Sequence, residues 1–69
     1  MTLIKRMKQE VRNHLDDYLD GSRCFNTTQL GEHFLNVDNL EEGSDEEDEY
    51  WDAAASVASW AIKEYNLNE

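Results

Sequence analysis

The sequence predicts a small all-α domain with three helices: a long helix, a short helix, an acidic loop and a second long helix. Two stretches, residues 2–20 and 45–65, repeat apolar side chains at helical spacing, so each has one apolar face. The chain contains no proline and only three glycines, which suits helices better than sheets or linkers. Its 69 residues have room for one domain, 1–69, with a modest core. A core that small favours self-association.

The first helix is expected over residues 2–20. Thr2 is placed to cap its start, and Gly21 to end it in a left-handed conformation. Its apolar stripe consists of Leu3, Ile4, Met7, Val11, Leu15, Tyr18 and Leu19. Cations lie near its N-terminus, where the helix dipole disfavours them: Lys5, Arg6 and Lys8. Either the acidic part of the chain compensates them or they stay solvated, and exposed ion pairs are worth only about 0–1 kcal/mol.

The short helix is expected over residues 27–36. Asn26 is its N-cap, with Gln29 at the third helical position, and Phe25 with Leu30 forms a hydrophobic staple. The side chains expected to face inward are Leu30, Phe34 and either Leu35 or Val37. Gly31 should weaken the middle of this helix. In the polar connection 36–43, Val37 and Leu40 are expected to hold the chain against the core.

The third helix, residues 45–65, is the best core former in the chain. Ser44 and Glu47 form a capping box at its start, and Asn66 is a plausible stop. Its apolar face consists of Tyr50, Trp51, Ala54, Val57, Ala58, Ala61, Ile62 and Tyr65. Small residues allow another helix to approach closely: Ala53, Ala54, Ala55, Ala58 and Ala61. Trp60 lies to the side of the apolar face, so either a second helix covers it or it is exposed for a partner.

Charge is distributed very unevenly along the chain. The net charge is -10, and residues 24–69 hold twelve acids against one base, whereas residues 1–23 hold four acids and five bases. This distribution argues against direct binding to nucleic acid or an anionic membrane, because affinity for polyanions comes from cationic surface. It favours a basic partner.

Nine carboxylates fall within residues 38–52: Asp38, Glu41, Glu42, Asp45, Glu46, Glu47, Asp48, Glu49 and Asp52. Four of them share one side of the third helix, opposite its apolar face: Asp45, Asp48, Glu49 and Asp52. Carboxylates three and four residues apart on a helix lie about 5–6 Å apart at their Cβ atoms, a repeat comparable to that of phosphates along a strand. Such a row can imitate a polyanion. The alternative is a solvated surface that only keeps the protein soluble.

The predicted function is that of a small acidic inhibitor or regulator that acts as a DNA mimic in the basic groove of a nucleic-acid-handling protein. In size and charge the chain resembles small acidic inhibitors from phages and mobile elements, of the anti-CRISPR and anti-restriction kind. The expected partner-binding residues are Glu41, Glu42, Asp45, Glu46, Asp48, Glu49, Asp52 and Trp60. A homodimer through the Ala-rich, Trp60-bearing side of the third helix is also expected. The alternative function is a helical adaptor or oligomerisation module with apolar contacts.

Other chemistry has little support in the sequence. Residues 38–49 match a calcium loop at its first, sixth and twelfth positions, but Leu40 and Asp45 break two others. His14, His33 and Cys24 lack the spacing of a metal site, so we expect no cofactor, metal or catalysis. TTQLGEHF lacks the cations of a DNA-reading helix. One cysteine, no signal peptide and no apolar run of about 18 residues predict a soluble, cytoplasmic protein.

Overall fold

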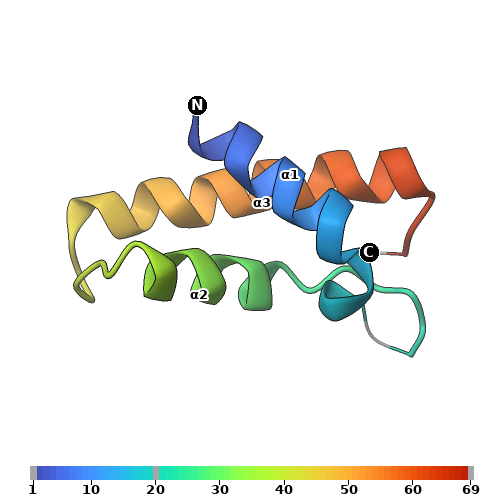
Figure 1. Ribbon diagram of the computed structural model, residues 1–69, viewed down its shortest axis with the longest axis horizontal. Coiled ribbons are helices and arrows are strands. Elements are labelled where there is room, and N and C mark those ends of the chain that lie inside the picture. The colour runs from blue at the N-terminus through green and yellow to red at the C-terminus, as the bar shows by residue number, and fades with distance from the viewer. Residues whose placement is uncertain (1, 20, 69) are drawn as a thin grey trace.

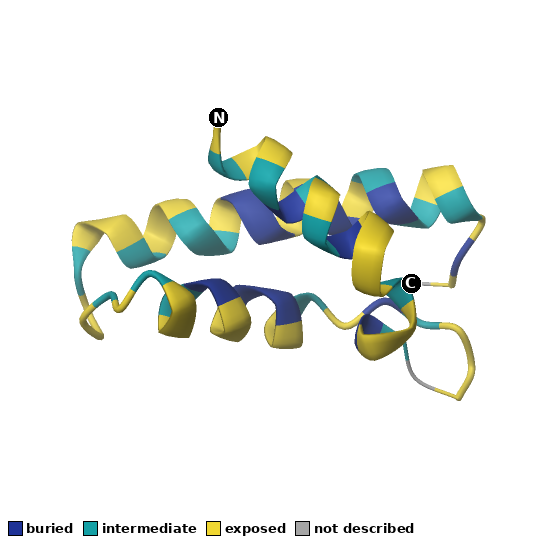
Figure 2. Cartoon of the chain, viewed as in Figure 1, coloured by how far each residue is buried: buried dark blue, intermediate teal, exposed yellow. Residues whose placement is uncertain are grey.

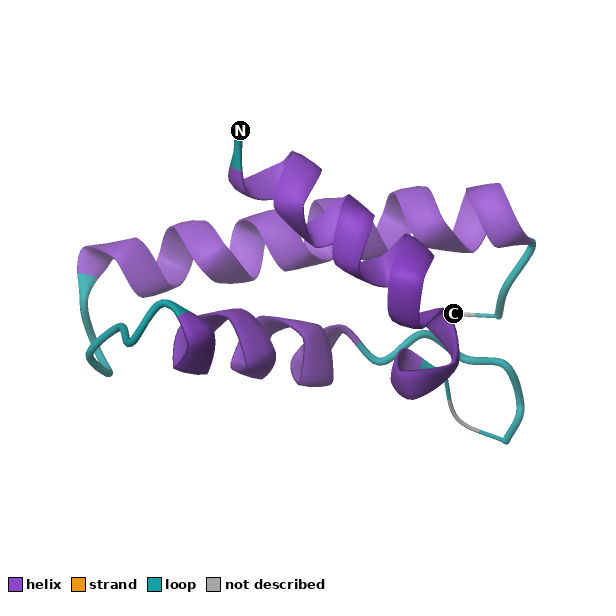
Figure 3. Cartoon of the chain, viewed as in Figure 1, coloured by secondary structure: helices purple, strands orange, loops and turns teal. Residues whose placement is uncertain are grey.

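The computed structural model describes residues 2–19 and 21–68 and confirms the all-α fold. Three α-helices follow one another as α1 (Leu3–His14), α2 (Thr27–Val37) and α3 (Asp45–Tyr65) (Figure 1). A single 3-10 turn, η1 (Leu15–Tyr18), extends α1. Within the described residues there is no strand, only two isolated bridges in the connections (Figure 3).

The longest helix, α3, is the central element. It contacts both α1, which crosses over it, and α2, which runs back beside its N-terminal half. The core between them is made of side chains from all three helices and their connections: Met7, Val11, Tyr18, Phe25, Leu30, Phe34, Ala53, Ala54, Val57, Ala58, Ala61 and Leu67. The faces of α2 and α3 that turn toward each other are buried, whereas the first turns of α3 remain exposed or half-buried (Figure 2). The buried alanines of α3 therefore let the other helices of the same chain approach α3 closely.

The first helix ends earlier than expected. Its α-helical part stops at His14, where φ is -136°, and the chain tightens into η1. The turn carries Tyr18 into the core at 4% exposure, and its hydroxyl donates to Glu10 at 3.1 Å. The chain then reverses so that Leu19 bridges Phe25. These contacts take the place of the last turns of a regular helix, and the predicted end at residue 20 lies outside the described residues.

The loop after η1 is tied to the C-terminal segment. Arg23 has a left-handed conformation, with φ 61°, where Gly21 was expected to supply it. The Arg23 carbonyl accepts from the backbone N–H of Asn68 at 3.1 Å, and the Ser22 carbonyl accepts from the Asn68 side chain at 2.6 Å. Asn66 ends α3, as predicted, and the structure shows it in a left-handed conformation with φ 54°.

The predicted helix starts are correct, but the Glu47 side chain binds a different backbone N–H from the one expected. Thr2, Asn26 and Ser44 each accept a hydrogen bond from the backbone N–H three residues on. The carboxylate of Glu47, however, accepts from the N–H of Gly43 at 2.9 Å. Ser44 cannot complete the capping box, because its own N–H donates to the Glu41 carbonyl at 3.4 Å.

Two apolar side chains expected in the core are exposed. Ile4 is 40% exposed and Val37 is 59% exposed, while Leu30 and Met7 are fully buried. Val37 lines an open groove between α1 and α2 because α2 ends there, so it does not hold the connection against the core. Leu40 is half-buried, in keeping with its expected role.

Gly31 is a contact point between α2 and α3, although from its low helix propensity we expected only that it would weaken the middle of α2. It is buried, and the indole of Trp51 from α3 lies directly against it. A Cβ atom on residue 31 would lie 2.2 Å from Cζ3 of Trp51, inside any permitted contact distance. The absence of a side chain at residue 31 therefore lets α2 and α3 approach each other with a large ring between them.

Candidate partner-binding surface

The acidic segment is folded, and it divides into two groups of carboxylates. Asp38 and Glu47 are half-buried and hydrogen-bonded within the chain. The other seven are exposed, and we call them the acidic ridge: Glu41, Glu42, Asp45, Glu46, Asp48, Glu49 and Asp52. These are the seven carboxylates that the sequence suggested for partner binding.

Asp38 joins all three helices at one end of the molecule. The guanidinium of Arg6 in α1 donates to both of its oxygens, at 2.8 and 3.0 Å, and the hydroxyl of Tyr50 in α3 donates to one of them. The Arg6 guanidinium also lies 5.5 Å from the centre of the Phe34 ring. Hydrogen bonds from Arg6 and then Tyr50 lower the pKa of Asp38 to about 2. Asp38 of the acidic segment thus compensates the positive charge of Arg6 near the N-terminus of α1.

Replacing Asp38 with Asn should lower the free energy of unfolding by about 1–2 kcal/mol at pH 7, because a bidentate charged pair is lost. The ordinary pKa of 3.8 lies above the folded value, so the contribution is complete above pH 3.8 and disappears as the pH falls toward 2. Urea unfolding of both proteins at pH 7, 4 and 2.5 measures this. Glu42→Gln, at an exposed carboxylate nearby, is the control and should stay within about 0.5 kcal/mol. Equal stability of Asp38→Asn and the wild type at pH 7 would contradict the assignment.

Glu47 fixes the start of α3 beneath the ridge. One of its oxygens accepts from the N–H of Gly43, and the other accepts from the indole Nε1 of Trp51 at 3.4 Å. Since Trp51 in turn packs on Gly31, the turn before α3 is connected to α2 through the side chains of Glu47 and Trp51. The ridge therefore stands on an ordered frame.

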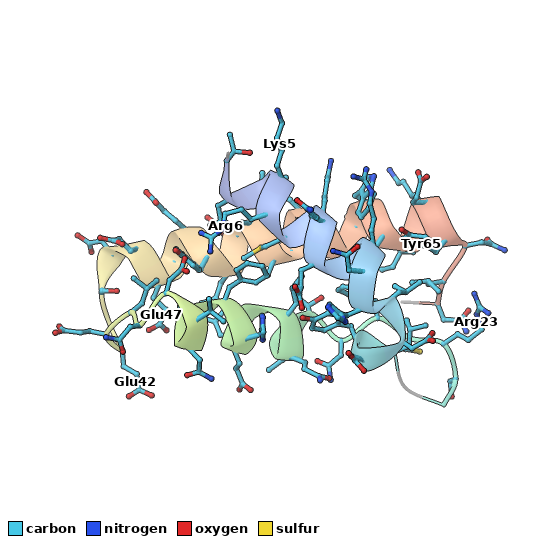
Figure 4. All side chains as sticks on the ribbon, in the orientation of Figure 1. Lys5, Arg6, Arg23, Glu42, Glu47 and Tyr65 are labelled. Carbon is cyan, nitrogen blue, oxygen red and sulfur yellow. The ribbon has the colours of Figure 1, made fainter. Side chains whose placement is uncertain are left out.

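The ridge begins at one end of the long axis of the molecule and continues along the first half of α3. Figure 4 shows Glu42 at this end, beside Glu47, and Arg23 at the opposite end (Figure 4). On α3, Asp45, Asp48, Glu49 and Asp52 are exposed, opposite the buried positions 54, 57, 58 and 61. In the described part of the chain, Arg6 forms an ion pair with Asp38, and His14 and His33 lie 3.7 Å from the carboxylates of Asp17 and Glu10. None of these pairs neutralises a ridge carboxylate.

Trp60 is separate from the ridge and partly covered. It is half-buried, with Nζ of Lys8 at 5.1 Å and Cζ of Arg12 at 5.2 Å from its ring centre, and Tyr65 meets it edge to face. Because two cations of α1 lie over this ring, the structure is closer to the alternative in which a second helix covers Trp60 than to the one in which Trp60 is exposed for a partner. Trp60 lies eight residues beyond Asp52, about 12 Å of helix rise. The structure does not bring it into the ridge.

A polar cleft of about 520 Å³, which the sequence did not suggest, opens between α1, η1 and α2. His33 Nε2 lies 3.7 Å from Glu10 Oε1, and His14 Nδ1 lies 3.7 Å from Asp17 Oδ2. Burial, followed by the hydrogen bond to Glu10, raises the pKa of Tyr18. Residues 2–19 and 21–68 contain no group of three or more acidic, His or Cys side chains arranged to hold a metal ion. The packing of α2 against α1 and the 3-10 turn together form this cleft, which no short sequence motif could reveal.

Comparison with known proteins finds no matching family model, and no curated protein or solved structure that matches the chain. Across the described residues, no helix combines the length and the apolar character needed to cross a membrane.

Proposed function

We propose that this protein binds a protein that handles nucleic acid, and blocks or regulates it by placing the acidic ridge in its basic groove. One observation carries the proposal: seven exposed carboxylates stand on a folded frame, and no ion pair recorded within the described residues includes any of them. The two remaining carboxylates of the segment, Asp38 and Glu47, hold the frame.

The spacing of the ridge supports imitation of a polyanion. Asp48 and Glu49 lie three and four residues after Asp45, and Asp52 lies four and three residues after them, so the Cβ atoms of these pairs are about 5–6 Å apart along α3. When the cations of a basic groove bind phosphates, they release the counterions condensed on the nucleic acid, so the affinity falls as the salt concentration rises. A fixed row of carboxylates can satisfy the same cationic side chains and show the same salt dependence.

The distribution of like charge also supports a binding role. Asp45 and Glu46 lie in the first turn of α3, where the helix dipole stabilises negative charge. Asp48 ends that turn, and Glu49 and Asp52 lie beyond it; like charges three and four residues apart repel one another, at a cost of a few tenths of a kcal/mol for each close pair. Solubility alone does not require that this charge be concentrated on one stripe of one helix.

The alternative, an adaptor with apolar contacts, has less surface to use. Ile4 and Val37 are the large hydrophobic side chains exposed in the described residues, and they lie on different helices. Trp60 is already covered in part by Lys8 and Arg12. The two functions differ in their response to salt, because apolar contacts are insensitive to it while charge pairing is screened.

The test is capture of partners from an extract of the native host on the immobilised protein, at about 50 and 300 mM salt. We expect nucleic-acid-binding proteins to be retained at low salt, to be released at high salt, and to be eluted by added duplex DNA. An uncharged polymer of similar length is the control for the DNA elution. Partners that resist both salt and DNA would remove the mimicry proposal and favour the adaptor.

A further inference from the structure

An open hollow of about 360 Å³ adjoins the C-terminal end of the acidic ridge. We call it the apolar notch, and its lining residues are Thr2, Leu3, Ile4, Ala53 and Ser56, with Glu49 and Asp52 of the ridge at its edge. It lies where the first turn of α1 meets the middle of α3. Its apolar walls and its acidic edge thus belong to one continuous surface.

The notch exists because the side chains of α3 at this point are small. Ala53 is buried and Ser56 is exposed, so neither fills the space beside α1. Met7 and Val11, further along the α1 stripe, are completely buried, whereas Ile4 is 40% exposed. An aliphatic surface is therefore left uncovered directly beside two carboxylates that have no ion-pair partner in the described chain.

We infer that the notch receives one aliphatic side chain of the partner, from a segment in which lysine or arginine residues flank that side chain. This inference rests on the proposed function and names the chemistry of the partner. The flanking cations would pair with Glu49 and Asp52 while the aliphatic group contacts Leu3 and Ile4. A polycation without such a side chain could pair with the ridge but would leave the notch empty. The notch would therefore favour one kind of basic protein segment over polycations in general.

A second copy of this chain does not fit the notch. Its own exposed aliphatic side chains are Ile4 and Val37. Val37 is followed at once by Asp38 and the acidic turn. Ile4 is followed by Lys5, but it lines the notch itself, so a second copy that docked through Ile4 would bring its own Glu49 and Asp52 against the same edge of the first copy. Like charges opposed in this way disfavour the contact.

The experiment uses two synthetic basic peptides of about fifteen residues that carry the same lysines at helical spacing. One has a central Leu and the other a central Ser. Binding is measured by fluorescence anisotropy at about 50 and 300 mM salt. The wild-type protein should bind the Leu peptide about tenfold more tightly than the Ser peptide, since part of one aliphatic side chain leaves water. Both peptides should weaken as salt rises.

Two matched variants locate the preference. Ser56→Leu fills the notch and should reduce the tenfold preference to about twofold or less. Ser59→Leu adds the same side chain at another exposed position of α3, outside the lining of the notch, and should keep the preference. Ile4→Ser, compared with Val37→Ser, tests the opposite wall. Circular dichroism checks the fold, and the Ser56 variant decides the matter if Ile4→Ser unfolds.

Each outcome has a distinct meaning. Equal binding of the two peptides overturns the notch inference and leaves the ridge proposal standing. A Leu preference that persists in Ser56→Leu overturns it as well. Failure of both peptides to bind at low salt removes the ridge proposal and the notch together. A dimer in sedimentation that Ser56→Leu abolishes would show that a second copy, not a basic segment, occupies the notch.

Discussion

Reversing Asp45, Asp48, Glu49 and Asp52 to lysine should weaken partner binding at least 100-fold at about 0.1 M salt. Each reversal replaces an attraction to the basic groove with a repulsion, and contacts of this kind supply most of the affinity when a groove is built for phosphate. Lysine is a better helix former than aspartate, so α3 should persist. The measurement is titration with a captured partner, together with circular dichroism of the variant.

The matched control reverses four exposed carboxylates elsewhere on the chain: Asp16, Asp17, Glu32 and Glu64. Each reversal changes the charge by two, so both variants go from a net charge of -10 to -2. The control should keep its affinity within about fivefold, since screening limits the effect of distant charges. Equal losses in the two variants would show that net charge acts rather than the ridge, and unchanged affinity in the ridge variant would refute the proposed function.

Replacing Gly31 with alanine should destabilise the protein by about 1–3 kcal/mol, even though alanine favours a helix by about 1 kcal/mol over glycine. The added Cβ would lie 2.2, 2.6 and 2.9 Å from three ring carbons of Trp51. The ring is rigid, and its Nε1 donates to Glu47, so it cannot move aside without losing that contact. Chemical denaturation followed by circular dichroism gives the free energy of unfolding.

The effect of Gly31→Ala on the free energy of unfolding should change sign once the Trp51 ring is absent. In a Trp51→Ala background, Gly31→Ala should stabilise the protein by up to about 1 kcal/mol, because only the helix propensity remains. Thr28→Ala, at an exposed position of α2, is the control and should stabilise by about 0.5 kcal/mol in both backgrounds. A stabilising Gly31→Ala in the wild-type background would contradict the packing described for Trp51.

The helices themselves could be predicted because their signals are local. Asn26 and Ser44 mark helix starts within three residues of the N–H groups they cap, and Asn66 marks the end of α3. The exposed side of α3 follows from its period alone, so the ridge residues on that helix could be chosen before any fold was known.

Other features depend on which helices meet, and no local signal contains that information. The early end of α1 depends on Tyr18 reaching Glu10 after a 3-10 turn. From sequence, Gly31 could only be expected to weaken α2, because helix propensity contains no information about the Trp51 indole that packs against it. Asp38 finds its partner in Arg6, 32 residues away. The notch exists only because α1 begins beside Ala53.

The separation of charge along the molecule has a kinetic consequence. The Cα trace extends 32 Å along its longest axis, and the seven carboxylates of the ridge gather toward the end that carries Glu42, away from Arg23 at the other end. Such a body is an electric dipole, and the field of a positively charged groove exerts a torque on it before contact. It would arrive with its acidic end leading, which shortens the rotational search, so ionic strength would govern the speed of encounter as well as the lifetime of the complex.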